Sequence, residues 1–145
     1  MIKNIVKGKQ IFSKKAIPAT EADRQVITDL LDTLRANREI CVGMAANMIG
    51  VNKAIIVVAA GPFQFAMINP VITRKSGPYE TEEGCLSLPG LHESVRRSLA
   101  IRMRYLDENF EPHDEEFTGL PAWVIQHEYD HLEGVVFTDL SLIHI

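Results

Sequence analysis

The 145-residue sequence has few cysteines, little net charge and no long apolar segment. Two cysteines, Cys41 and Cys85, are too few for a disulfide framework, which leaves both thiols for other chemistry. No apolar run is long enough for a signal peptide or a membrane span, so we expect a reducing, cytoplasmic location and no membrane contact. The net charge is −4, and the scattered lysines and arginines give no support for nucleic-acid binding.

The amino-acid composition is ordinary for a globular protein. Hydrophobic residues make up 46% of the chain and charged residues 23%. The length is sufficient for a hydrophobic core without disulfides or structural metals, and it fits one folding unit. We therefore expect a single domain over residues 1–145.

Hydrophobic patterning predicts two helices separated by strands. Apolar residues at helical spacing, behind a capping Thr20, predict an amphipathic helix over 21–37. The second helix follows Thr118, with Pro121 in its first turn.

Between the helices, the pattern predicts antiparallel strands. Apolar runs over 54–59 and 63–68 predict a hairpin, and alternation over 99–105 predicts a half-exposed strand. Turn residues are expected to break or end strands at Asn69-Pro70, at Ser76-Gly77-Pro78 and at Pro89-Gly90, and a last strand is expected over 135–137. The order of elements predicts an α+β fold, with small antiparallel sheets packed around the second helix.

The second helix contains the pattern His-Glu-x-x-His within Gln126-His127-Glu128-Tyr129-Asp130-His131. On a helix, His127 and His131 lie one turn apart on the same face, where two imidazoles can hold a metal ion. Glu128 can then reach a water molecule at the metal as a general base. Short patterns of this kind also arise by chance on surface helices, so further ligands are needed to support a metal site.

The third ligand is not decided by the residues alone. The acidic residues after the motif lie too close along the chain to His131, and His144 is a formal candidate. Cys85 lies upstream among small residues, and a thiolate is a good ligand for iron or zinc. A lone cysteine is more often a small buried side chain, which keeps that alternative open.

Two motifs together resemble those of the peptide deformylases. The segment Glu83-Gly84-Cys85-Leu86-Ser87 is similar to the second motif of that family, and the His-Glu-x-x-His segment is similar to the third. Further positions resemble the family in the same order along the chain: Ile68-Asn69-Pro70, Pro89-Gly90, Arg97, Gly134, Phe137 and Asp139. The resemblance covers nearly the whole chain and implies a catalytic domain of this family.

The resemblance implies a hydrolase that removes the N-formyl group from the initiator methionine of new bacterial and organellar proteins. It also implies one divalent metal, natively Fe²⁺ with Zn²⁺ or Ni²⁺ able to substitute, bound by Cys85, His127 and His131. Glu128 would carry a proton from water to the leaving amine, and the backbone N–H of Leu86 would bind the developing oxyanion.

The resemblance further implies that the loop at Gly43 and the strand before Cys85 pair with the peptide backbone. An apolar pocket for methionine would be lined in part by Ile125 and Tyr129, although packing in the helix core is an alternative for both. The expected partners are N-formylmethionyl nascent peptides, with the ribosome as a further candidate, and we expect a monomer. Three polar residues are expected to be structural or on the surface: His92, His113 and Arg97.

One motif departs from the family pattern Gly-x-Gly-x-Ala-Ala-x-Gln. Cys41 stands at the first glycine, and Met48 stands at the glutamine, where the family has an oxyanion donor. A thioether cannot donate a hydrogen bond, and Asn47 is expected to point the other way on an extended segment. Three alternatives follow: a working deformylase of a divergent branch, a related N-acyl metallo-amidase, or a low-activity or inactive paralogue that binds metal and peptide. The retained ligands and Glu128 favour the first, with Met48 at the substrate site.

The last residues, 140–145, do not resemble the ending of related chains. Their sequence, Leu-Ser-Leu-Ile-His-Ile, is also a translation of a common sequencing adapter. We expect the native sequence to be interrupted near Asp139, in which case His144 is not a ligand.

Overall fold

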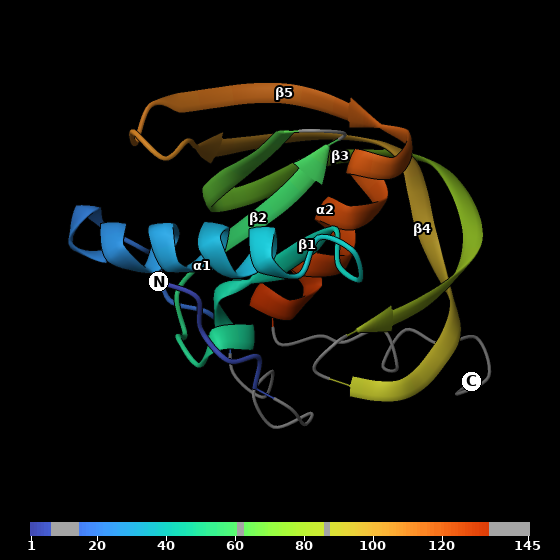
Figure 1. Ribbon diagram of the computed structural model, residues 1–145. Coiled ribbons are helices and arrows are strands. Elements are labelled where there is room, and N and C mark those ends of the chain that lie inside the picture. Colours follow the sequence, from blue (N-terminus) through green and yellow to red (C-terminus); the bar gives the residue numbers. More distant parts are fainter. Residues whose placement is uncertain (7–14, 61–62, 86–87, 134–145) are drawn as a thin grey trace.

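The computed structural model describes the backbone of residues 1–6, 15–60, 63–85 and 88–133, and the side chains of these residues except at 60, 84–85 and 88–93. Within these ranges the chain forms two α-helices, two short 3-10 helices and one antiparallel sheet. The elements are η2 (Glu21–Asp23), α1 (Arg24–Ala36), β1 (Gly43–Ala45), η3 (Ala46–Ile49), β2 (Ile55–Ala60), β3 (Phe63–Cys85), β4 (Leu88–Leu106), β5 (Pro112–Thr118) and α2 (Gly119–Leu132) (Figure 1). The α+β prediction is confirmed, with one continuous sheet in place of several small ones.

The first helix forms where the hydrophobic spacing predicts it. The backbone N–H of Thr20 donates to the carboxylate of Asp23 at 2.9 Å, which anchors the turn η2 ahead of α1. The apolar face of α1, which includes Ile27, Leu30 and Leu34, is buried. The predicted helix over 21–37 therefore matches the η2–α1 pair to within one residue at its end.

The two helices cover opposite faces of the sheet, as the side-chain alternation of β2 shows. Ile55, Val57 and Ala59 pack in the core that contains α1, whereas Ile56 and Val58 pack in the core that contains α2. Successive side chains of a strand point to opposite faces, so an apolar strand without polar interruptions is covered on both sides. The predicted β2–β3 hairpin is confirmed, with Ala60 paired to Phe63.

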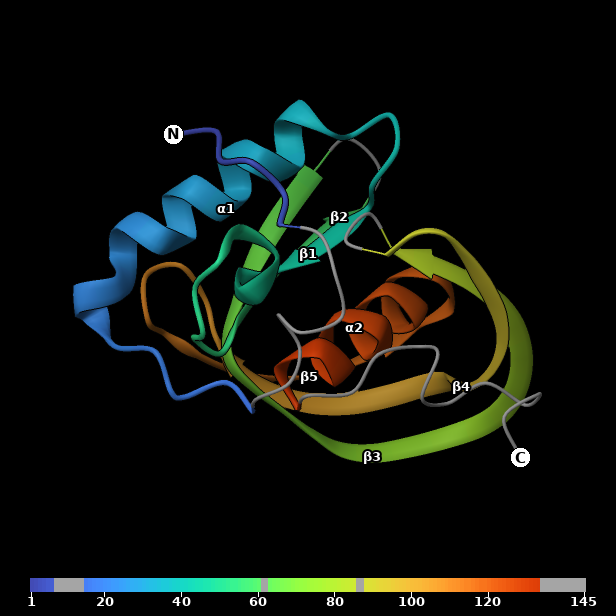
Figure 2. The ribbon, with the colours of Figure 1, turned by 90° about the horizontal axis from the view of Figure 1, so that it is seen from below.

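The β3–β4 hairpin is much longer than predicted, and it curves around α2 (Figure 2). The breaks expected at Asn69-Pro70 and at residues 76–78 are wrong, because β3 continues through both, and residues 89–90 lie within β4. The chain accommodates Asn69 (φ 52°) next to a register shift between Ile68 and Val71. A bulge of this kind absorbs a residue that cannot join the ladder and bends the strand instead of ending it.

The helix α2 is attached to the sheet by the side chain of Gln126, which hydrogen-bonds to the backbone of β4. The Gln126 amide accepts from the Ser98 backbone N–H at 2.9 Å and donates to the Ser98 carbonyl at 2.7 Å. This pair of hydrogen bonds fixes the middle of α2 against β4. Among the helices within the described ranges, none is both long and apolar enough to cross a bilayer.

Candidate active site

The helix α2 brings His127 and His131 together in a buried position. The Nε2 atoms of the two imidazoles are 3.1 Å apart, and the rings meet edge to face with centroids 4.6 Å apart. Their side chains contact each other because residues four apart lie on the same helix face. The exposed fractions are 8% for His127 and 0% for His131, so the pair is removed from bulk water.

The carboxylate of Glu83 determines which nitrogen of His127 faces His131. The Nδ1 atom of His127 lies 2.5 Å from Glu83 Oε1. Because an ionised carboxylate can only accept, Nδ1 carries the proton and donates it, which leaves a lone pair on Nε2. A carboxylate behind an imidazole is the usual support for a metal-binding histidine.

The spacing of the two nitrogens fits a metal ion between them. Zinc–nitrogen bonds measure about 2.0–2.1 Å, so two imidazoles at a tetrahedral ion have nitrogens roughly 3.3 Å apart. The observed 3.1 Å between the Nε2 atoms is close to that value. The carboxylate of Glu128 also lies near the pair, and one donor atom from each of the three residues falls within 4.8 Å of the others.

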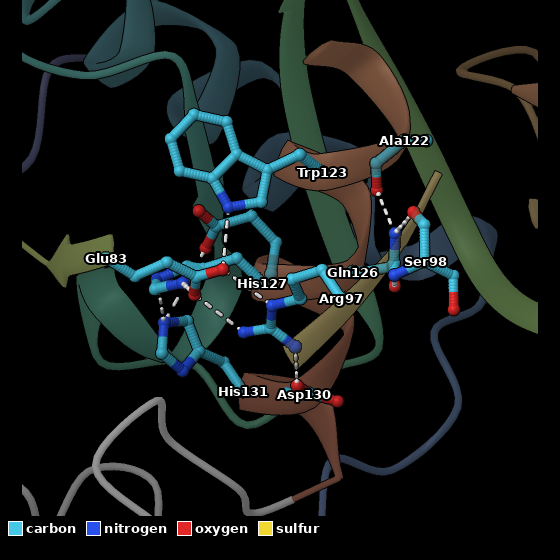
Figure 3. Close-up of polar contacts among 10 residues, drawn as sticks. Glu83, Arg97, Ser98, Ala122, Trp123, Gln126, His127, Asp130 and His131 are labelled. Carbon is cyan, nitrogen blue, oxygen red and sulfur yellow. Dashed lines mark hydrogen bonds and ion pairs between the residues drawn. The ribbon is translucent and has the colours of Figure 1, made fainter. Parts of the chain in front are cut away.

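Glu83 is held as an anion by a ring of donors (Figure 3). Arg97 donates from Nε to Oε2 at 2.6 Å and from Nη2 to Oε1 at 2.7 Å, and the Trp123 indole donates to Oε2 at 2.6 Å. Burial opposes ionisation, but the donors Arg97 and His127 outweigh it and lower the pKa of Glu83 to about 2. The carboxylate is therefore charged over the whole physiological range.

Arg97 also contacts a second carboxylate. Its Nη1 atom donates to Asp130 Oδ2, so one guanidinium joins β3, β4 and α2 beside the histidines (Figure 3). The side chain of Arg97 is 4% exposed and that of Glu83 is 1% exposed. Of the two roles expected for Arg97, surface or structural, the structure places it in the buried, structural one.

Glu128 differs from Glu83 in having few polar partners. Burial raises its pKa to about 7, and the nearby Glu83 contributes in the same direction, while His127 and Arg97 act against it. Its Oε1 atom has no hydrogen-bond partner within the described part of the chain and lies 3.9 Å from His131 Nε2. A buried carboxyl whose pKa lies near neutrality can both take up and return a proton at physiological pH.

Strand β1 lies directly against this part of α2. A Cβ added at Gly43 would overlap Val124 Cγ1 and lie 3.2 Å from both Cγ and Oε2 of Glu128. Glycine is therefore required for β1 to approach the carboxylate this closely. Strand β1 is the first strand in the sheet order, and its described pairing is with β2 alone.

The residues after β1 are in a 3-10 turn, so the expectation of an extended segment at Asn47 is wrong. The Asn47 amide donates to the His131 backbone carbonyl at 2.9 Å and is directed there. Met48 is 1% exposed, and its Sδ accepts weakly from the Ala45 backbone N–H at 3.5 Å. A buried thioether thus occupies the position where the family pattern has its glutamine.

Some predicted site residues are in the hydrophobic core, and others lie outside the residues that the structure describes. Cys85 is the last residue of β3, two residues after Glu83, but its side chain, all of Leu86, and residues 134–145 with His144 lie outside the described residues. Ile125 is fully buried in the core between α2 and the sheet. Tyr129 is half-buried, and its pKa is raised by burial and by Glu133. The metal and substrate roles of these residues remain predictions.

The supporting residues Glu83, Trp123 and Asp130 were not identified as functional by sequence reasoning. The available signal was spacing, because Trp123 lies one helical turn before His127 and Asp130 lies one turn after Gln126. Arg97, which joins Glu83 to Asp130, lies on β4. Its position follows from the β3–β4 pairing, in which Arg97 lies opposite Tyr79.

Comparisons with known proteins identify the family of this chain. The family model for polypeptide deformylase matches residues 2–142. The peptide deformylase of Clostridium beijerinckii is 52% identical over 136 residues, which cover 94% of this chain and 99% of the relative. A peptide deformylase of Pseudothermotoga lettingae is 41% identical over 145 residues, covering 97% of this chain and 83% of the relative.

Solved structures show the same fold. The crystal structure of peptide deformylase from Thermotoga maritima superposes with a TM-score of 0.88 at 32% identity, covering 97% of this chain and 98% of that one. A peptide deformylase from Legionella pneumophila gives a TM-score of 0.88 at 33% identity, with 97% and 86% covered. The chain therefore belongs to the polypeptide deformylase family, the metal-dependent hydrolases that remove the formyl group from the N-terminal methionine of newly made proteins.

Proposed function

We propose that this deformylase holds one divalent metal with Cys85, His127 and His131 and uses Glu128 to move the proton. The observation that carries the proposal is the buried pair of Nε2 atoms, 3.1 Å apart, beside a carboxylate oxygen without a partner among the described residues. The bond from His127 Nδ1 to Glu83 supports the role of Nε2 as a ligand. Cys85 completes the set, as the last residue of the strand that carries Glu83.

A divalent ion at these residues supplies Lewis-acid activation of water and of the formyl carbonyl. Glu128 takes the proton of the attacking water, and it returns that proton to the amine nitrogen as the carbon–nitrogen bond breaks. In the metal-free protein burial raises the pKa of Glu128 to about 7, and a divalent ion nearby favours the ionised form that accepts the proton of water. The backbone N–H of Leu86 donates to the oxygen of the formyl carbon as negative charge develops there.

The peptide is proposed to bind along β1. This strand begins the sheet order, and Gly43 lies against Glu128, so an extended peptide paired with β1 would pass in front of the carboxylate. The methionine side chain would enter an apolar pocket to which Ile125 and Tyr129 contribute. A crystal structure of a peptide deformylase from Acinetobacter baumannii holds a bound Met-Ala-Ser peptide, which has the chemistry of the expected product.

The native metal is proposed to be Fe²⁺, with Zn²⁺ or Ni²⁺ able to replace it, because a thiolate with two imidazoles suits all three ions. The proposed setting is the cytoplasm, where the enzyme acts as a monomer on N-formylmethionyl nascent peptides, with the ribosome as a candidate partner. The proposed catalytic domain spans residues 1–145.

The test is an assay of iron-loaded protein, prepared under low oxygen, on formyl-Met-Ala-Ser and on acetyl-Met-Ala-Ser. Release of formate from the first peptide, without turnover of the second, is the expected result. Turnover of the acetyl peptide alone would support a related N-acyl amidase. Binding of metal and peptide with no turnover of either substrate would support an inactive paralogue, and both results would contradict the proposal.

The substitution Met48→Gln should increase the formyl-Met activity by about tenfold. Loss of one oxyanion donor typically costs about 10²–10³-fold in rate, and part of this should be recovered by an amide at this position. Glutamine has a volume similar to that of methionine. Met48 packs in the apolar core that contains α1, where an amide without a partner is costly, so the new side chain is expected to turn towards the site. The measurement is kcat/KM on formyl-Met-Ala-Ser.

A matched control is Met44→Gln, which places the same amide at a buried position of β1. This variant should gain no activity. Unchanged or lower activity in Met48→Gln, with a normal melting temperature, would show that this branch stabilises the oxyanion with another donor.

A further inference from the structure

The indole of Trp123 donates to Glu83, the carboxylate that holds His127, and the mechanism above gives this indole no role. Trp123 is the single tryptophan of the sequence, is half-buried, and precedes His127 by one turn of α2. In Figure 3 its ring stands above the site, with the nitrogen directed at Glu83. The Nε1–Oε2 distance is 2.6 Å, which is short for an N–H···O hydrogen bond.

This hydrogen bond completes the coordination of the Glu83 carboxylate. Within the described part of the chain, Oε1 accepts from Arg97 and His127, and Oε2 accepts from Arg97 and Trp123. An ionised carboxylate offers about four lone-pair sites, so each is filled by one donor. Glu83 is 3% exposed, so water could not easily replace a donor that is lost.

The orientation of this carboxylate depends on its donors, because the terminal torsion of a glutamate is soft. Arg97 contacts both oxygens from one edge. Trp123 and His127 then contact different oxygens, so a rotation that breaks one bond also disturbs the other. An indole N–H is a donor without charge, so it fixes the carboxylate while weakening the attraction for the His127 proton less than a second cation would.

We propose that Trp123 is a positioning residue, which acts through Glu83 to hold His127 in its ligating orientation. The inference rests on the proposed metal site. If Trp123 has this role, the metal affinity depends on its indole N–H as well as the fold does. The path runs through two hydrogen bonds, from Trp123 to Glu83 and from Glu83 to His127.

The first test uses the unsubstituted chain, labelled with ¹⁵N, because it has one indole resonance. The Trp123 Nε1 proton should appear well downfield of free indole. Bound Zn²⁺ should move it back towards the free-indole position, since charge withdrawn from His127 strengthens its bond to Glu83 and leaves less negative charge to attract the indole N–H. A resonance at the free-indole position, or one unmoved by bound Zn²⁺, would contradict the positioning role.

The second test measures Zn²⁺ affinity in competition with a chromophoric chelator. Trp123→Phe should weaken binding by about 2- to 10-fold, the usual worth of one hydrogen bond, and Trp123→His, which retains a ring N–H, should recover part of it. The control Phe117→Leu removes packing from a half-buried ring that contacts Phe65 and Tyr105, and it should leave the affinity unchanged.

The outcomes separate this inference from the proposed site. Unchanged Zn²⁺ affinity in a folded Trp123→Phe variant would show that the indole serves packing alone, with the metal site intact. If the unsubstituted chain bound no Zn²⁺, the proposed site itself would be wrong and the role of Trp123 would fall with it.

Discussion

Replacing Glu128 by glutamine should lower kcat/KM on formyl-Met-Ala-Ser by about 10²–10⁴-fold, the usual contribution of a general acid–base residue. The amide keeps the size of the side chain but can neither accept the proton of water nor return it to the amine. Metal content should stay the same, because Glu128 is assigned to proton transfer and Cys85 to the third ligand position. Kinetics and elemental analysis of the same sample would measure both effects.

The matched control is Glu133→Gln, the same change one residue after α2. Glu133 is exposed and pairs with Lys15 at 3.2 Å, so its loss should change neither activity nor metal content. Because Glu128 also lies within ligand distance of the histidine pair, loss of metal in Glu128→Gln would identify it as the third ligand and contradict the assignment of Cys85.

The same substitution should stabilise the metal-free protein at alkaline pH. Burial raises the folded-state pKa of Glu128 to about 7, above its ordinary value of 4.5. The folded protein therefore holds this proton more tightly than the unfolded chain, and stability falls as pH rises from about 4.5 to 7. Glutamine removes that loss, so metal-free Glu128→Gln should be more stable than the unsubstituted protein above pH 7, by an amount of the order of 3 kcal/mol. Urea unfolding at pH 5 and pH 8 would measure it, and an equal difference at both values would argue against the shifted pKa.

Replacing Arg97 by methionine should destabilise the protein by about 3–5 kcal/mol, the cost of removing one partner from a buried ion pair. Methionine fills the space but leaves the carboxylates of Glu83 and Asp130 without their cation. With two donors lost, Glu83 should also hold His127 less firmly, so metal affinity should fall as well. Urea unfolding of the metal-free protein at pH 7 separates the first effect from the second.

The neighbouring Arg96 provides a matched control. It pairs with Glu80 at 4.0 Å, and both side chains are more than half exposed, so Arg96→Met should change stability by no more than about 0.5 kcal/mol. A similar cost for both variants would show that the loss comes from the strand itself and not from the buried carboxylates.

The cost of Arg97→Met should depend on pH in a defined direction. The folded-state pKa of Glu83 is about 2, below the ordinary value of 4.5, so its contribution is fully present above pH 4.5 and is lost as pH falls towards 2. The difference between Arg97→Met and the unsubstituted protein should therefore be largest near neutrality and shrink below pH 4.5. A difference that grew on acidification would contradict the assignment of Glu83 as the charged partner.

Local spacing was enough to locate the central part of the site. Residues four apart on a helix must lie on one face, so His127 and His131 could be paired without knowledge of the fold. The same reasoning predicted α1 and the β2–β3 hairpin, because a hydrophobic period is a property of consecutive residues. The resemblance of two motifs to the peptide deformylases added the family, which the comparisons confirm.

Local sequence patterns did not predict that the sheet is continuous. Asn69, Pro70 and Gly77 are turn residues by local preference, yet β3 passes through all three positions. The pairing of β3 with β4 over most of their length outweighs that preference. A bulge turns the expected break at Asn69-Pro70 into curvature, and the pairing stays in register through Gly77. This curvature places the β3–β4 hairpin around α2 (Figure 2).

The order of residues was enough to identify the helix, its two imidazoles, the adjacent carboxylate and the family. The groups that support them are known only from the fold: Glu83 lies behind His127, Arg97 joins Glu83 to Asp130, and Trp123 fills the last position on the carboxylate. The physical reason is that ligand spacing on one helix is a local property. The protonation and orientation of those ligands depend instead on burial and on donors from other strands, which only the folded chain brings together.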